Sequence, residues 1–145
     1  MGIRPRPQNR LTSGPFFVPL SIDGDPEEGA VDFLLIGFKN LARLPSTVDV
    51  SVHVCRDLDL FPATPPEIEI FRQDDVTIPA GNCAVLKVDS GPGTFTGNNM
   101  LRVVVEGDID KDGDRIVVAL SGGNEDGRTA VSMVFKHEEF IEFDD

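Results

Sequence analysis

The sequence contains no tryptophan and no tyrosine, although it has ten phenylalanines. Tryptophan and tyrosine combine an aromatic ring with a polar tip, and proteins favour them in ligand pockets and at binding surfaces. A phenylalanine ring has no polar atom, so its main role is to fill apolar space. The composition therefore disfavours a sugar-binding module that stacks its ligand on a tryptophan or tyrosine ring.

Long apolar runs are also lacking. The longest strongly apolar stretch, residues 33–38, includes a glycine, and a membrane-spanning helix needs about 20 apolar residues. The chain carries 25 acidic against 13 basic residues, a formal charge of −12. Such a surface repels phosphate groups. We therefore expect neither a membrane span nor a nucleic-acid partner.

No catalytic signature stands out. The sequence has only two histidines and no G-x-S-x-G motif. The glycine-rich stretch at residues 91–97 contains no lysine and is not followed by a helical pattern, so it does not fit a phosphate-binding loop. We expect the protein not to be an enzyme and to need no cofactor, with calcium as the one ion that deserves consideration.

The apolar residues recur with a period of two. In residues 47–55, TVDVSVHVC, valine alternates with more polar residues. This alternation is typical of a strand with one buried face. No window of helical length shows an apolar stripe at helical spacing. Similar alternation occurs in residues 68–70, 76–78, 84–88, 101–105, 116–120 and 131–135.

Turn-forming residues separate these segments. The clearest signal is Asp112-Gly113, where glycine supplies the positive φ of a tight turn, so we predict a hairpin there. Residues 33–38 hardly alternate, which favours a central strand. The 145 residues fit one domain. About eight short strands predict an all-β fold, a single jelly-roll or immunoglobulin-like β-sandwich over residues 21–145, preceded by an extended N-terminal tail.

The first twenty residues differ from the rest. They contain three arginines, four prolines and no acidic residue. Proline disfavours regular helix, so we expect residues 1–20 to form an extended connector. Prolines and polar residues also occupy the place where an export signal has its apolar stretch, so no Sec signal is visible.

An extended segment can add a strand to the free edge of a sheet. We hypothesise that the connector docks on a neighbouring copy, since a head-to-tail contact that does not close produces a filament. Residues 16–22 taken alone slightly favour the alternative, a first strand of their own domain. The partners would be other copies of the chain, contacted through Arg4, Arg6, Arg10, Phe16, Phe17, Val18 and Leu20.

With this tail and the segments VDFLLIGFKN, STVDVSVHVC and LRVVVEG, the chain resembles the small β-sandwich subunits of bacterial surface fibres, notably the endospore appendage family. The resemblance implies a jelly-roll subunit whose N-terminal connector enters a neighbour, displayed outside the cell or on the spore surface. Connectors of that family typically carry cysteines for cross-linking, and residues 1–20 have none. A bond between subunits would therefore have to use Cys55 or Cys83.

The two cysteines, Cys55 and Cys83, leave three alternatives open. Both fall on the outward parity of their expected strands. They form an intramolecular bridge that contributes about 3 kcal/mol, remain free thiols in a reducing compartment, or link neighbouring subunits. Their spacing does not fit a zinc site.

The segment that begins at residue 108 has the D-x-D-x-D-G spacing with which alternate carboxylates converge on calcium. An EF-hand is excluded, because Ala119 stands where that motif needs a bidentate glutamate. A solvated acidic turn is the more common alternative to a calcium loop. Together with residues 90–100, the loop defines a second functional hypothesis, a monomeric calcium-dependent adhesion or glycan-binding module. The candidate ligands are Asp108, Asp110, Asp112 and Asp114.

Overall fold

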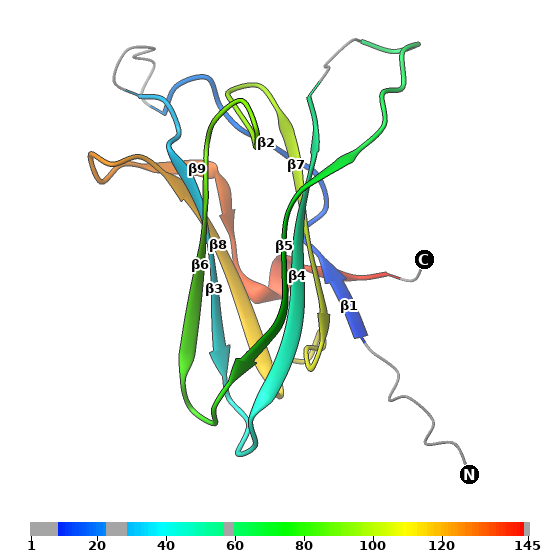
Figure 1. The fold of residues 1–145 in the computed structure, drawn as a ribbon, viewed down its shortest axis with the longest axis vertical. Helices are drawn as coiled ribbons and strands as arrows, with labels where there is room; N and C mark the ends of the chain where they lie inside the picture. The colour runs from blue at the N-terminus through cyan, green and yellow to red at the C-terminus, as the bar shows by residue number, and fades with distance from the viewer. Residues whose placement is uncertain (1–8, 23–28, 57–59, 144–145) are drawn as a thin grey trace.

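The computed structural model describes residues 9–22, 29–56 and 60–143, and all structural statements refer to these residues (Figure 1). They form ten strands and one short 3₁₀ helix, η1 (His137–Glu139). The strands make two sheets that pack face to face. The expected all-β sandwich is therefore confirmed.

The larger sheet is built around two long strands near its centre. Its order is β10 (Ile141–Glu142), β1 (Asn9–Thr12), β7 (Met100–Gly107), β4 (Ser46–Cys55) and β5 (Ile68–Ile78), and β2 (Phe16–Phe17) also pairs with β7. The smaller sheet has the order β6 (Cys83–Asp89), β3 (Phe33–Asn40), β8 (Ile116–Gly123) and β9 (Thr129–Phe135). The paired strands of both sheets are antiparallel.

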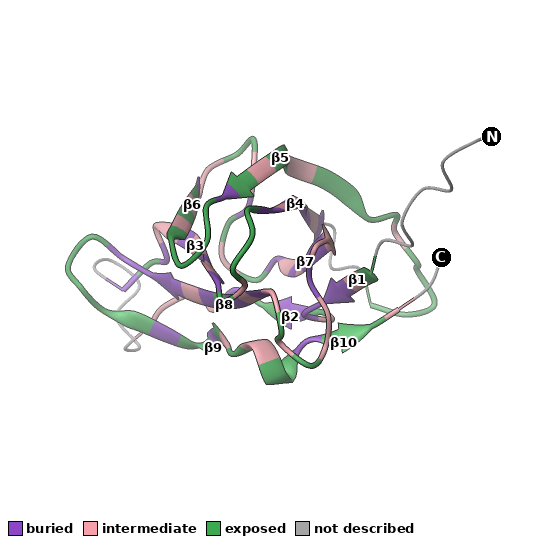
Figure 2. Ribbon diagram, turned by 90° about the horizontal axis from the view of Figure 1, so that it is seen from below, coloured by how far each residue is buried: buried purple, intermediate pink, exposed green. Residues whose placement is uncertain are grey.

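The core lies between the sheets and follows the predicted alternation. The four alternate valines of β4 are buried, and on the opposite sheet Leu34, Ile36 and Phe38 of β3 are buried too. Strand β3 pairs with β6 on one side and β8 on the other, as expected of a central strand. Figure 2 shows buried residues concentrated in the inner strands, whereas the edge strand β5 is mostly exposed.

The turn at Asp112-Gly113 does not close a hairpin, so that prediction is wrong. Strand β7 pairs with β4 in the larger sheet, and β8 pairs with β3 in the smaller one. The loop between β7 and β8 therefore crosses from one sheet to the other. Gly113 has the expected positive φ of 74°. The local turn signal was correct, but each strand finds its partner elsewhere in the chain.

Strand β9 departs from the predicted parity. Ala130 and Met133 are buried, whereas Val131 is 85% exposed. The pairing of β8 with β9 shifts register between Leu120 and Gly122. Such an irregularity changes which residues face the core.

The N-terminal segment belongs to its own sandwich, which corrects the expected boundary at residue 21. Strand β1 pairs with β7 and β10, and β2 extends the contact with β7. Leu11, Phe16 and Val18 are all buried in the common core. The sandwich thus includes residues 9–20, which do not form an extended connector.

A leucine pair within this segment tests the revised boundary. We expect Leu11→Ala to lower the free energy of unfolding by about 2–5 kcal/mol, because it leaves a cavity in the core. The same change at Leu20, whose side chain is largely exposed, should cost less than about 0.5 kcal/mol. Urea unfolding measures both. Equal effects of the two substitutions would show that β1 is not part of the fold.

Candidate functional site

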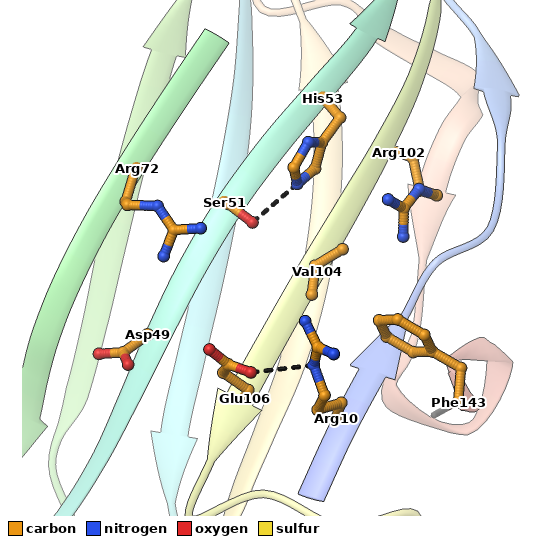
Figure 3. Close-up of a pocket in the computed structure, with 9 residues that line it drawn as sticks. All are labelled: Arg10, Asp49, Ser51, His53, Arg72, Arg102, Val104, Glu106 and Phe143. Carbon is orange, nitrogen blue, oxygen red and sulfur yellow. Dashed lines mark hydrogen bonds and ion pairs between the residues drawn. The ribbon is translucent and has the colours of Figure 1, made fainter. Parts of the chain in front are cut away.

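A shallow depression of about 400 Å³, partly open solvent, lies on the outer face of the larger sheet (Figure 3). Its lining comes from β1, β4, β5 and β7 and from the segment after β10. The alternation that sends the valines of β4 inward sends its polar residues outward into this depression. The lining residues are Arg10, Asp49, Ser51, His53, Arg72, Arg102, Val104, Glu106 and Phe143.

Ion pairs dominate the depression. Arg10 Nε lies 2.9 Å from Glu106 Oε2. Arg102 donates to both carboxylate oxygens of Glu67, at 2.9 and 2.6 Å. The ring of Phe143 has a guanidinium near it from each arginine, with its centroid 5.0 Å from Arg10 Cζ and 5.8 Å from Arg102 Cζ. Charge-assisted and cation–π contacts therefore engage these cations within the chain.

Ser51, His53 and Glu67 lie next to one another as serine, histidine and acid do in a hydrolase triad. Their geometry does not support catalysis. Ser51 Oγ lies 2.9 Å from His53 Nε2, whereas Glu67 Oε1 is 3.8 Å from His53 Nδ1, beyond hydrogen-bond distance. Ser51 is only 4% exposed, and Arg102 holds the carboxylate of Glu67.

His53 should make the stability of the fold depend on pH. Burial lowers the pKa of His53, and the opposing attraction of Glu67 is smaller. The unfolded chain therefore binds a proton near pH 6.5 that the folded chain binds only at lower pH. Stability should fall as the pH drops from about 6.5 towards the folded pKa.

We expect His53→Gln to reduce this loss between pH 7 and pH 5, measured by urea unfolding at several pH values. His137 is present in both proteins, so the difference between their pH profiles isolates His53. Arg102, by hydrogen bonding, lowers the pKa of Glu67 below its usual 4.5, so Glu67 acts at lower pH. Parallel profiles for the two proteins would contradict this assignment.

The acidic loop brings together three of the four predicted calcium ligands. Carboxylate oxygens of Asp110, Asp112 and Asp114 lie within 4.8 Å of one another. Asp108 is engaged elsewhere, because its carboxylate accepts a hydrogen bond from Thr47 N at 2.9 Å and pairs with Arg115 at 3.1 Å. Asp108 thus joins the loop to β4 and does not belong to the cluster of three carboxylates.

The rest of the loop is fastened to the C-terminal segment. His137 Nδ1 accepts a hydrogen bond from Val118 N at 3.2 Å, so the other ring nitrogen, Nε2, donates to the carbonyl oxygen of Asp110 at 2.7 Å. Lys111 Nζ contacts the carbonyl oxygens of Glu138 and Phe140. These contacts fix the position of the loop at Asp110 and Lys111.

A calcium titration separates the two interpretations of the loop. Calcium binding predicts that millimolar calcium raises the Tm, because it binds only the folded loop, and that Asp112→Asn with Asp114→Asn removes the rise. Magnesium is the matched control, since its octahedral preference fits a three-carboxylate loop less well. An unchanged Tm in calcium would exclude the calcium loop and favour the solvated acidic turn.

The loop of residues 90–99 lies far from the acidic loop. One precedes β7 and the other follows it, and a strand of eight residues spans roughly 25 Å. Phe95, within the first loop, is buried in the core. The two loops therefore do not form a single common site in this fold, and a calcium-dependent binding module stays a prediction.

The predicted tail contacts are only partly available to a neighbour. Phe16 and Val18 are buried in their own core and are not available to a neighbour. Arg10 pairs with its own Glu106, and its part in a subunit contact stays a prediction. Phe17 and Leu20 are exposed. Two further predicted contacts, Arg4 and Arg6, lie outside the described residues.

The two cysteines lie at opposite ends of the sandwich. Cys55 is the last residue of β4, whereas Cys83 pairs with Lys39 near the turn that leads into the first residue of β4. The length of β4, ten residues, is roughly 30 Å, and a disulfide needs Cα atoms about 4.4–6.8 Å apart. Both thiols are free, so the intramolecular bridge does not form in this fold.

The same two ends expose large apolar side chains that the sequence analysis did not single out. In the turn between β3 and β4, Leu41 is 56% and Leu44 64% exposed; we call this pair the turn patch. In the loop after β4, Leu60 is 88% and Phe61 86% exposed; we call this pair the loop patch. Figure 1 shows the turn at the bottom of the molecule and the loop at the top. The sequence signal that could have indicated these patches is the presence of large apolar residues within predicted turns.

Hydrogen bonds hold the turn patch in place. The buried side chain of Asn40 donates to the carbonyl oxygens of Leu44 and Ile78, each at 2.8 Å, and accepts from Ala42 N at 2.9 Å. The backbone N–H of Leu41 donates to Arg115 O at 2.7 Å. The two leucines are thus presented on a fixed turn, which lowers the entropic cost of a contact.

Comparison of the chain with protein-family models, with curated proteins and with solved structures finds no match. Within the part of the chain that the structure describes, no helix is long and apolar enough to cross a membrane.

Proposed function

We propose that the protein is a structural subunit of a homopolymer, in which the turn patch of one copy contacts the loop patch of the next. The observation that carries the proposal is the exposure of large apolar side chains at both ends of the sandwich. Burying such side chains against each other removes apolar surface from water, at roughly 25 cal/mol per Å². The contact therefore has a driving force.

The position of the patches determines the kind of assembly. The turn patch and the loop patch are different surfaces, so a contact between them is head-to-tail and leaves one free patch on each outer copy. Such contacts extend into a filament unless the rotation between copies closes a ring. Both patches lie beyond the ends of β4, which favours growth along the strand direction.

This proposal keeps the self-assembly expected from the sequence and changes its mechanism. Residues 9–20 lie in their own sandwich, so strand exchange through them has no part in it. It involves no catalysis. Display outside a bacterial cell or on a spore surface, which the resemblance to endospore appendage subunits implies, stays a prediction.

The contact should be weak unless something else holds it. Stable protein interfaces bury roughly 1,200–2,000 Å² of surface. The two patches together offer only three leucines and one phenylalanine, which supply less than this area. We therefore expect association that depends on concentration when the thiols are reduced.

Paired serine substitutions test the proposal by sedimentation under reducing conditions. The average mass of the unchanged protein should rise with concentration. It should stay near the monomer value for Leu41→Ser/Leu44→Ser and for Leu60→Ser/Phe61→Ser. A mixture of these two variants should form dimers only, because each retains one working patch.

Val131→Ser is the matched control, since Val131 is 85% exposed but lies on the edge strand β9. It should associate like the unchanged protein. A monomer at all concentrations would overturn the proposal. Loss of association in Val131→Ser alone would replace it with pairing between sheet edges.

A further inference from the structure

We infer that Cys55 of one copy forms a disulfide with Cys83 of the next. The inference rests on the proposed head-to-tail contact and names the covalent bond that would make it durable. It assigns a role to both thiols of the chain, which the fold prevents from bonding to each other within one molecule.

Each thiol lies at the same end of the sandwich as one of the two patches. Cys55 ends β4 shortly before Leu60, at the end that carries the loop patch. At the other end, Cys83 pairs with Lys39, and the neighbouring Asn40 N–H donates to Asn82 O at 3.0 Å. Leu41 of the turn patch follows directly. A contact between the two patches therefore brings one thiol of each kind to the same interface.

The two thiols differ in exposure. Cys83 is exposed and Cys55 is half-buried. The exposed residues of β6 alternate with less exposed ones, so Cys83 and Val85 lie on the same outer face. Val85 extends the apolar surface next to Cys83, because its side chain is also exposed.

The number of cysteines matches a linear chain. Each copy has one thiol at each end, and the sequence contains no other cysteine. Every inner copy would use both thiols, with one bond to the preceding copy and one to the following copy. This arrangement converts a weak contact between unlike ends into a continuous covalent polymer.

The chemistry needs an oxidant, for which a low-molecular-weight disulfide such as oxidised glutathione is sufficient. One cysteine thiolate attacks it, forms a mixed disulfide and releases one glutathione thiolate. The second cysteine thiolate then displaces the other glutathione. The two protein thiols lose two protons and two electrons, and the glutathione disulfide is reduced to two thiols.

The test incubates the full chain with oxidised glutathione and analyses it on a non-reducing gel. The unchanged protein should give a ladder of covalent oligomers that reductant collapses to the monomer. Cys55→Ser and Cys83→Ser should each give only monomer, and their mixture should give a covalent dimer and nothing larger. Mass spectrometry of the ladder should find a peptide that joins residue 55 to residue 83.

The single variants distinguish this inference from bonds between identical cysteines. A covalent dimer of either variant by itself, at the yield of the mixture, would overturn it. Circular dichroism of each variant checks that it is folded. Association in sedimentation without any covalent ladder would refute the disulfide and leave the proposed function intact, whereas the absence of association would refute the proposed function.

Discussion

The packing of alternate apolar side chains between the two sheets is the interaction on which the rest of the structure depends. The buried valines of β4 and the buried residues of β7 face those of β3 and β8. These strands give the molecule a long axis with two distinct ends. The turns and loops that connect the strands lie mostly at these ends, because their backbone groups need water or local partners. Leu41, Leu44, Leu60 and Phe61 are exposed there, and the two cysteines lie at the ends of strands β4 and β6.

The N-terminal segment could pair with strand β7 of its own molecule or with the same strand of a neighbouring copy. Without the N-terminal segment, strand β7 would have a free edge on the side away from β4, and an extended apolar segment could pair with it. The chain's own residues 9–17 occupy this edge. They are covalently attached to the same molecule, so their effective concentration exceeds that of a neighbour's tail at ordinary protein concentrations. This edge of β7 is therefore occupied within the molecule, and the short strand β10 forms the edge of the sheet.

The charge of the molecule favours contacts at its ends. The formal charge of −12 opposes close lateral packing of copies, particularly at low salt. The edge strand β5 also carries charged side chains, among them Arg72 paired with Glu69 and Asp74, and charges on an edge discourage strand pairing. These features are consistent with the proposed contact between the two apolar patches, which a disulfide between copies would make covalent.

The sequence by itself determined most of the strands and, outside β9, most of the residues that face inward, because a period of two is a local property of residue order. It was right for residues 47–55, for residues 101–105 and for the outward position of both cysteines. Only the tertiary structure decided that β7 and β8 lie in different sheets, that residues 9–20 complete their own sandwich and that Cys55 and Cys83 lie at opposite ends. Strand pairing joins residues far apart in the chain, and its outcome depends on competition among all the available edges, which local patterns do not encode.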